Sequence, residues 1–364
     1  TSGWTKTAYN TQYGLTLTAQ NMMGGNGGIG VANTITGTST YYGGGGGGGA
    51  NNNIGTQPAD RAGQGGLGGG GAGANADRGN GTAGTANTGG GGGGGDWEGA
   101  GAAGGSGIVV VNYGSNGSAL TINSGSGRVN MAGNVSDVTT LTINSSHASS
   151  EIAGVVSGSG SLVNSGTGGL ILSAINTFTG ATNINAGTLR VTGSLADTTA
   201  VTVASGATYD VAASDTIASL AGAGNVTLNS NTLTVGGSSN TTYSGVMSGT
   251  GSLVKAGTAN FTMSGANTYS GGTTVNAGLL FGGAGSELIT VFGSGTVTVN
   301  SGATLWLDRA TLSNNLVLNN ATLQGTNGFG EIFNGTISLT GVNEIKVGSY
   351  MTMNGVVSGT GDIV

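Results

Sequence analysis

Residues able to do acid–base or nucleophilic chemistry are few in this 364-residue sequence. It contains one histidine, His147, together with fourteen carboxylates and eight Lys or Arg side chains. A Ser-His-Asp triad would have to pair His147 with Ser145 or Ser146. These residues lie in the polar run 144–150, where serine is so frequent that the proximity does not indicate a nucleophile. We therefore predict no catalytic residue here.

Two pairs of carboxylates are close in the sequence. Asp96 and Glu98 would share one face of a strand, and Asp210 and Asp215 flank an expected turn. Acid–base hydrolysis of a glycan needs two carboxylates held about 5 to 10 Å apart, and neither pair recurs along the chain. A calcium-binding β-roll needs tandem Gly-Gly-x-Gly-x-Asp nonapeptides, and residues 91–98 offer one imperfect copy. We expect no dedicated metal site, and Asp96 and Glu98 are only weak candidate calcium ligands.

Aromatic side chains are the better candidates for binding. Trp97, Tyr41, Tyr42 and Tyr113 border a long glycine-rich stretch, and exposed aromatic residues are favoured contacts in recognition surfaces. The alternative is that they close the ends of that stretch as small hydrophobic plugs. No Gly-Lys-Ser or Gly-Lys-Thr follows the glycine runs, so a phosphate-binding loop is excluded and no cofactor is expected.

Composition excludes several further classes of protein. Glycine supplies 81 residues while Asp, Glu, Lys and Arg supply only 6%, against an ordinary ~25%. One proline and no Gly-X-Y period exclude collagen, and a net charge of -6 gives no basic surface for nucleic acid. The longest apolar run, 108–111, is far shorter than the ~20 residues of a membrane helix. The absence of cysteine fits the cytosol or an exported chain.

Composition also divides the chain into three zones that would position these residues. Residues 1–42 alternate as short strands do and are expected to form a β cap. Residues 43–107 contain 31 glycines in 65 positions. From residue 108 to 364, β-branched or apolar residues alternate with Thr, Ser and Asn, and no 3.6-residue period is sustained. We expect almost no helix.

The third zone is internally repeated. The block Gly-Val-Val-Ser-Gly-Ser-Gly-Ser-Leu-Val at 154–163 returns with small changes at 245–254 and 355–364. Within these blocks, strand cores recur at roughly 19 to 25 residues, the length of one coil of a parallel β-helix. A sandwich or barrel would not need a fixed coil length. We predict about 11 to 13 coils with parallel pairing, in a rod of roughly 50 to 60 Å.

The same repeats predict the core. Apolar residues at equivalent positions of the two long copies should be buried and stacked along the axis. The pairs are Leu162 with Leu253, Val163 with Val254, Leu189 with Leu280, and Val203 with Val299.

The repeated blocks, continued by Gly-Ala-Asn-Thr-Tyr-Ser-Gly-Gly-Thr-Thr-Val-Asn-Ala-Gly at 265–278, resemble the passenger-associated transport repeat of bacterial autotransporters and related secreted β-helix adhesins. This resemblance implies a right-handed β-helix that is secreted or displayed on the bacterial surface. The third copy breaks off at residue 364, so we expect the sequence to be part of a longer chain. The glycine-rich zone resembles modules of bacterial surface proteins in which polyglycine-II helices pack side by side, which side chains would prevent; a flexible linker is the alternative.

Together these observations predict an all-β, extracellular, non-enzymatic structural or adhesive protein, as a β-helical rod for adhesion or matrix formation. Two alternatives stay open: a self-assembling filament or sheath subunit, whose unpaired solenoid ends template the next copy, and a glycan-binding or glycan-cleaving β-helix protein. The expected partners are other copies of the chain, or a host, cell-surface or glycan receptor.

Overall fold

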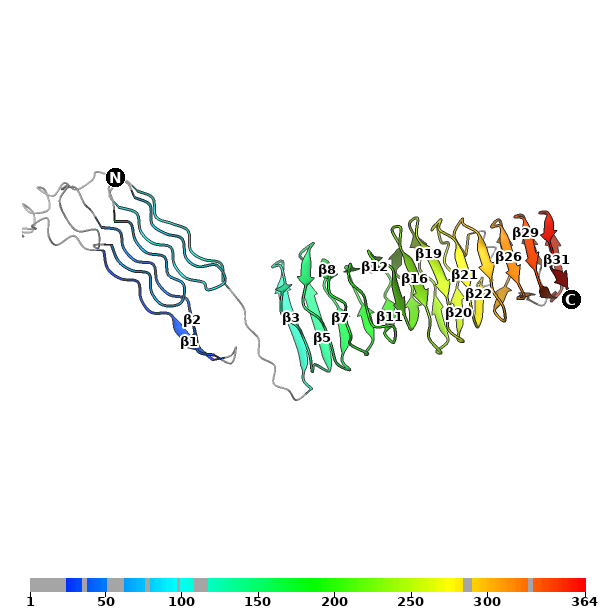
Figure 1. Cartoon of the computed structure of the whole chain (residues 1–364), viewed down its shortest axis with the longest axis horizontal. Coiled ribbons are helices and arrows are strands. Elements are labelled where there is room, and N and C mark those ends of the chain that lie inside the picture. Colours follow the sequence, from blue (N-terminus) through cyan, green and yellow to red (C-terminus); the bar gives the residue numbers. More distant parts are fainter. Residues whose placement is uncertain are drawn as a thin grey trace, which may run out of the picture. The chain divides into compact units, whose positions relative to one another are not determined.

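The computed structural model describes residues 24–34, 38–50, 62–75, 79–96, 99–107, 117–283, 290–326 and 330–364. The chain divides into two compact units, Thr1–Asn112 and Tyr113–Val364, shown in Figure 1. Every regular element in the described residues is a strand, as predicted. No helix in those ranges is long and apolar enough to cross a membrane.

The first unit consists of glycine-rich segments held together through their backbones. Its two described strands, β1 (Val31–Asn33) and β2 (Thr40–Tyr42), pair antiparallel. Elsewhere the segments are bonded laterally. For example, the N–H groups of Gly44, Gly47 and Ala50 donate to the carbonyls of Gly68, Gly71 and Ala74.

These lateral bonds recur at every third residue, which is the period of a polyproline-II-type helix. The bonds require close approach, since a Cβ atom added to Gly46 would lie 2.0 Å from the carbonyl oxygen of Gly92. Glycine is therefore needed there for space rather than for flexibility. The polyglycine-II geometry of the whole zone stays a prediction.

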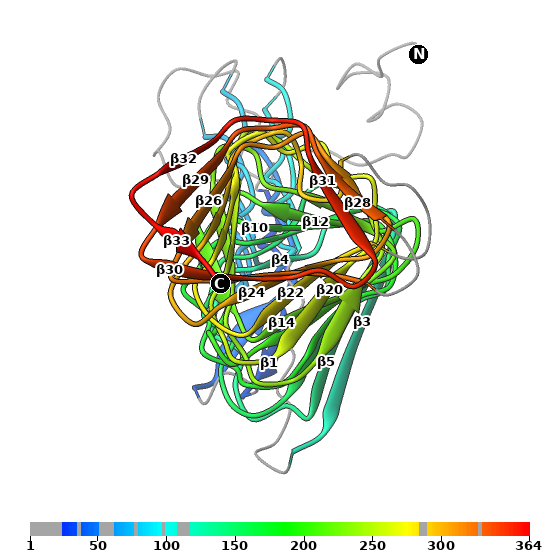
Figure 2. The same cartoon turned by 90° about the vertical axis from the view of Figure 1, so that its right-hand side faces the viewer.

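The second unit is a parallel β-solenoid, as the repeats predicted. Its strands stack into sheets along the axis, one of which runs the length of the unit, and all the strand pairs recorded in it are parallel. Viewed from the C-terminal end, the coils superpose as three walls around a common axis (Figure 2). The right-handed sense stays a prediction.

The first wall is a thirteen-stranded sheet, here called the long wall, to which each coil contributes one strand. Its strands are β3 (Ala119–Gly125), β5 (Thr140–Ser145), β7 (Ser161–Asn164), β9 (Thr182–Ile184), β11 (Ala200–Val203), β14 (Ser219–Gly222), β17 (Thr241–Tyr243), β20 (Asn260–Met263), β22 (Leu279–Gly282), β24 (Thr304–Leu307), β27 (Thr322–Gly325), β30 (Val342–Lys346) and β33 (Asp362–Ile363).

The other walls are shorter. The seven-stranded wall comprises β4 (Asn130–Met131), β6 (Ser150–Ile152), β8 (Gly169–Leu172), β10 (Thr188–Val191), β12 (Thr208–Val211), β15 (Asn225–Thr227) and β18 (Met247–Ser248). The eight-stranded wall comprises β13 (Asp215–Ile217), β16 (Thr232–Val235), β19 (Ser252–Lys255), β21 (Thr273–Val275), β23 (Val297–Val299), β26 (Leu316–Asn319), β29 (Ile337–Thr340) and β32 (Val357–Gly359). Three strands form a further sheet: β25 (Thr311–Leu312), β28 (Gly330–Phe333) and β31 (Tyr350–Met353).

The core is a continuous column of apolar side chains inside the walls. Strands show alternating buried and half-buried residues, because successive side chains point to opposite faces. Six of the eight predicted core residues are fully buried: Leu162, Leu253, Leu189, Leu280, Val203 and Val299. The prediction for Val163 and Val254 was wrong, since each follows an inward leucine and therefore lies half-buried on the outer face.

The repeat copies do not stack on one another, which corrects a second expectation. Leu162 belongs to the long wall on β7, whereas its equivalent Leu253 belongs to the eight-stranded wall on β19. The register instead stacks Leu253 between Leu233 and Thr273. The 91 residues between the copies are not a whole number of coils, so the second copy lies on a different wall.

A buried asparagine nevertheless makes the same hydrogen bonds in both copies. The buried Asn176 accepts a hydrogen bond from the N–H of Val156 at 2.9 Å and donates to the carbonyls of Ala174 and Ser194. Its equivalent Asn267 accepts from the N–H of Met247 at 2.7 Å and donates to Gly265 and Val291. Each asparagine thus joins three successive coils and satisfies backbone groups at a corner where the strand ladder is interrupted.

Candidate functional site

His147 is part of a turn held by backbone hydrogen bonds. Its Nδ1 accepts a bond from the N–H of Ser149 at 3.1 Å. The hydroxyls of Ser145 and Ser146 both donate to carbonyls of the preceding coil, those of Gly127 and Gly125, at 3.0 Å. Neither hydroxyl is therefore directed at the imidazole as a nucleophile would be.

Asp96 also has a structural position. Its two carboxylate oxygens accept hydrogen bonds from the N–H groups of Gly79 and Gly99, each at 2.9 Å. The carboxylate therefore ties together segments of the glycine-rich unit. Trp97 and Glu98 lie outside the described residues, and within the described ranges no group of three potential metal ligands occurs.

The second carboxylate pair is divided between surface and interior. Asp210 accepts hydrogen bonds from Arg190 and Asn229 on the outer face of its wall. Asp215 is buried and accepts from the N–H groups of Leu195 and Thr216, both at 3.0 Å. Burial raises the pKa of Asp215 because the charged form is desolvated. The two carboxylates have different partners and do not form an acid–base pair.

The predicted aromatic surface is only partly described. Tyr41 is exposed and Tyr42 half-buried on β2, while Tyr113 lies outside the described residues. Ile29, Val31 and Leu67 are also exposed in this unit. Whether the four predicted aromatic residues form one binding surface stays a prediction.

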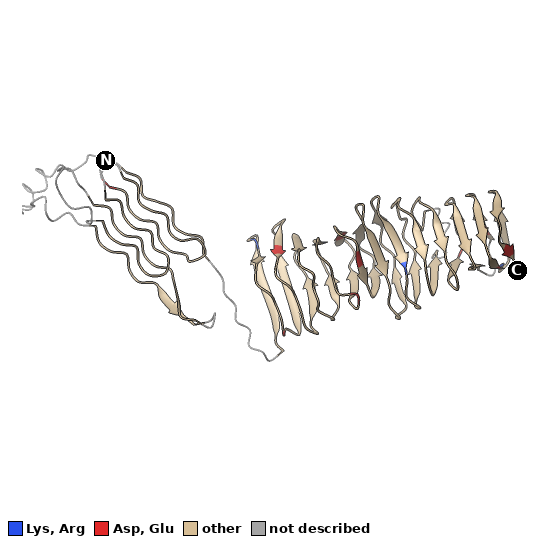
Figure 3. Ribbon diagram, in the orientation of Figure 1, with Lys and Arg blue, Asp and Glu red and all other residues tan. Residues whose placement is uncertain are grey.

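Charged side chains are sparse over the solenoid (Figure 3). Three ion pairs are present among the described residues: Arg128–Glu151 and Arg190–Asp210 between neighbouring coils, and Glu344–Lys346 within β30. All three are at least partly exposed and contribute little to stability. The outer surface is therefore mainly polar and uncharged.

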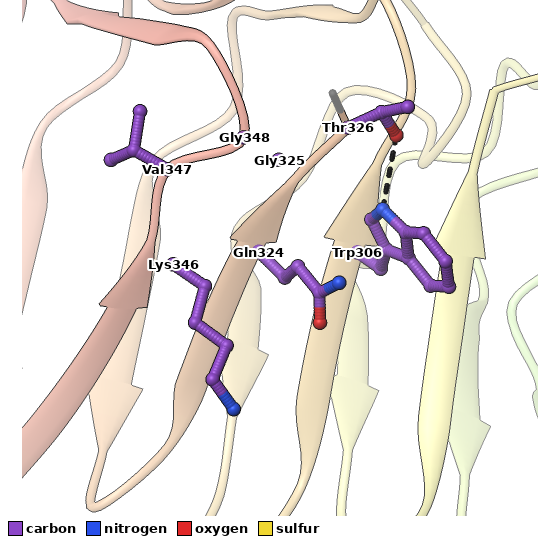
Figure 4. Close-up of a pocket in the computed structure, with 7 residues that line it drawn as sticks. All are labelled: Trp306, Gln324, Gly325, Thr326, Lys346, Val347 and Gly348. Carbon is purple, nitrogen blue, oxygen red and sulfur yellow. Dashed lines mark hydrogen bonds between the residues drawn. The ribbon is translucent and has the colours of Figure 1, made fainter.

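One hollow on the long wall combines an aromatic ring with polar side chains. Trp306 on β24, Gln324 on β27 and Lys346 on β30 are register partners on three neighbouring strands, and they line a cavity of about 260 Å³ (Figure 4). On the opposite side of Trp306, the ring of Phe281 on β22 packs edge to face, with ring centroids 5.2 Å apart and an interplanar angle of 82°.

A chain of hydrogen bonds fixes the orientation of the indole. Trp306 Nε1 donates to Thr326 Oγ1 at 3.0 Å, and the same hydroxyl donates to the carbonyl of Leu307 at 2.9 Å. The N–H of Thr326 donates to Glu331 Oε1 at 2.9 Å. Glu331 is fully buried, and this burial raises the pKa of its carboxyl group.

This hollow was not predicted from the sequence. Its residues are separated by about one coil each, so they become neighbours only when every coil length is known. A signal was present in the segments 279–282, 304–307 and 322–325, which share a central leucine followed by Phe281, Trp306 and Gln324. Aligning strands by that leucine would have placed the three side chains in one outward row.

Comparison with known proteins agrees with the repeats and the solenoid. The passenger-associated-transport-repeat family model matches residues 157–191 and 253–280. Over 139 residues the chain is 40% identical to the adhesin BmaC autotransporter of Brucella suis biovar 1 (strain 1330). The matched part covers 35% of this chain and 4% of that relative, so the chain spans a small fraction of the relative's length. No solved structure matches.

Proposed function

We propose that this chain is a segment of an autotransporter passenger and serves as a non-enzymatic adhesive rod outside the bacterial cell. The observation that carries the proposal is the presence of two passenger repeats within one parallel solenoid. The similarity to a protein named as an autotransporter adhesin supports the same role. The proposed partner is a receptor on a host or other cell surface.

The fold suits a protein that must hold a binding surface at a distance. Each coil adds about 4.8 Å to the length, and the long wall has thirteen strands. Backbone groups pair with the coils on either side, which leaves few free strands for a protease to bind. Among the described residues, the catalytic candidates His147, Asp96, Asp210 and Asp215 are bonded to backbone groups or to other surface residues, which supports a role that does not depend on a reactive centre.

The experiment measures whether the chain makes a non-adherent bacterium adhere to host cells. The chain is displayed on a non-adherent bacterial strain through an unrelated membrane anchor, and bound bacteria are counted on cultured host cells. We expect more bound bacteria than with the anchor alone. The matched control carries His147→Ala, Asp96→Asn and Glu98→Gln together, and it should adhere equally.

Two results would overturn the proposal. One is adhesion no greater than that of the anchor alone, although antibodies show the chain on the cell surface. The other is degradation of a surface polysaccharide by the purified chain that the triple replacement abolishes, which would return the protein to the glycan-cleaving class. Assembly into filaments stays a separate prediction, checked by electron microscopy of the purified chain.

A further inference from the structure

We propose that the hollow beside Trp306 binds a neutral pyranose ring of an oligosaccharide. The inference rests on the proposed adhesive role for its biological meaning, whereas the binding itself is a property of the hollow. Three features suit the hollow to this ligand: an aromatic platform, the polar groups beside it, and the buried hydrogen bonds that support it.

The aromatic part provides a flat apolar surface at the edge of a small cavity. Trp306 is half-buried and is held between Phe281 on one side and Gln324 on the other. A pyranose ring with equatorial hydroxyls has an apolar face of C–H groups that stacks on such a surface. The cavity of about 260 Å³ lies below the ~300 to 1,000 Å³ of drug-sized sites, which fits one sugar ring rather than a larger ligand.

The polar part suits hydroxyl groups. The Gln324 carboxamide makes no hydrogen bond with the described residues, so its two N–H donors and its carbonyl oxygen are free to bind a diol. Lys346, next along the row, forms an ion pair with Glu344 at 2.9 Å. Because that pair compensates its own charge, the hollow offers no net charge to an anionic sugar, and a neutral one is favoured.

The platform is preorganised. An exposed tryptophan ordinarily has several rotamers, and fixing one on binding costs free energy. Here the Nε1–H bond to Thr326 fixes the indole, and the buried Glu331 fixes Thr326. Gly325 permits this arrangement, since a Cβ atom at that position would lie 2.2 Å from Glu331 Oε2. Thr326 and Glu331 act on the indole as positioning residues, and the side chains proposed to recognise the sugar are those of Trp306, Gln324 and Lys346.

The aromatic platform is confined to a few coils of the solenoid. Earlier members of the same outward row are mostly small polar residues, such as Thr121, Thr142 and Thr202, and the row changes to aromatic residues only after Thr262. A general requirement of the solenoid would recur in each coil. The hollow is therefore a specific feature of the coils that contain β22 to β30.

The test uses the full chain with Trp4→Phe and Trp97→Phe, so that Trp306 is its remaining tryptophan. Cellopentaose, chitopentaose and lactose are the neutral probes, and sialyllactose is the charged one. We expect a saturable change of Trp306 fluorescence with at least one neutral probe, at a Kd of about 1 mM or below. Gln324→Ala should weaken it about tenfold or more, and Thr326→Val, which frees the indole, should weaken it as well.

Tyr350→Ala is the matched control, because Tyr350 is an exposed aromatic residue outside the hollow, and it should leave the Kd unchanged. The proposal fails if no neutral probe gives saturation up to about 10 mM, if sialyllactose alone binds, or if Gln324→Ala and Tyr350→Ala have equal effects. Measuring both adhesion and sugar binding of the parent chain separates the two proposals. Sugar binding without adhesion by the parent chain would refute the adhesive role alone, and adhesion without sugar binding would refute this site alone.

Discussion

At the scale of single residues, the two repeat copies act as natural variants of one another. Phe178 and Tyr269 are equivalent and both fully buried. In the second copy the Tyr269 hydroxyl bonds with Thr273 Oγ1 at 2.5 Å. In the first copy the equivalent hydroxyl, that of Thr182, is buried without a partner among the described residues. A buried polar group without a partner lowers the free energy of unfolding.

Phe178→Tyr should therefore stabilise the solenoid. The new hydroxyl would reach Thr182 as Tyr269 reaches Thr273, and we expect a gain of about 1 kcal/mol in the free energy of unfolding, measured by urea denaturation. The gain should vanish in a Thr182→Val background, where no acceptor remains. A gain of equal size in that background would show that the tyrosine acts through packing instead.

Lys255 is the second informative difference between the copies. It is buried, and its ammonium donates to the carbonyls of Gly257 and Ala277. In the first copy, Asn164 donates to the equivalent carbonyl of Ala186 at 3.0 Å. Burial lowers the pKa of Lys255 in the folded state.

This pKa shift predicts an alkaline pH dependence. Between the lowered folded pKa and the unfolded value of about 10.4, the unfolded chain binds more protons, so the free energy of unfolding rises with pH in that window. Lys255→Asn, which copies the first repeat, should abolish this rise. Denaturation midpoints at about pH 7 and about pH 10 check the difference, and an unchanged pH slope in the variant would assign the dependence to other groups.

At the scale of strands, alternation decides which substitutions matter. Leu253→Ala should cost roughly 2 to 5 kcal/mol, because Leu253 is fully buried. The neighbouring Val254 lies half-buried on the outer face, and Val254→Ala should cost about 0.5 kcal/mol. Thermal denaturation of the two variants gives the comparison. Equal costs would mean that β19 lies in a register shifted by one residue.

In the glycine-rich segments, the space around each glycine decides which substitutions matter. A Cβ atom at Gly92 would lie 1.9 Å from the carbonyl oxygen of Ala102, whereas one at Gly28 would meet nothing within 4 Å. Gly92→Ala and Gly92→Asp should therefore increase amide hydrogen exchange across the first unit, and the same changes at Gly28 should not. If all four variants exchange alike, close backbone packing does not hold this unit together.

At the scale of the whole molecule, the class of fold could be predicted from the sequence, but the wall that each repeated strand occupies could not. Alternating residues and repeated blocks sufficed for parallel coils, because both follow from local geometry. The wall that each strand occupies depends on the summed length of all preceding turns, which vary from coil to coil. That is why Leu162 and Leu253 were expected to stack, and why the row through Trp306 and Gln324 was missed.

A deletion tests whether a repeated strand can occupy a different wall of the solenoid. Removing residues 162–252 joins Ser161 to Leu253 and continues the repeat pattern without interruption, so β19 would take the position of β7 in the long wall. We expect a shorter solenoid with a cooperative thermal transition and a β-type circular dichroism spectrum. A deletion of 162–262, which ends half a coil later, should disturb the junction. Loss of folding in the first variant would show that each strand fits only its own wall.

The position of the repeat copies on different walls also bears on how such chains lengthen. The third copy, at β33, returns to the long wall that holds the first copy at β7. A repeat that fits more than one wall does not require that the duplicated DNA encode a whole number of coils, provided that the repeat pattern is continued. Unequal recombination between repeats can then add or remove partial coils without creating a misfolded junction, so the length of the rod is free to vary over generations while its architecture is inherited intact.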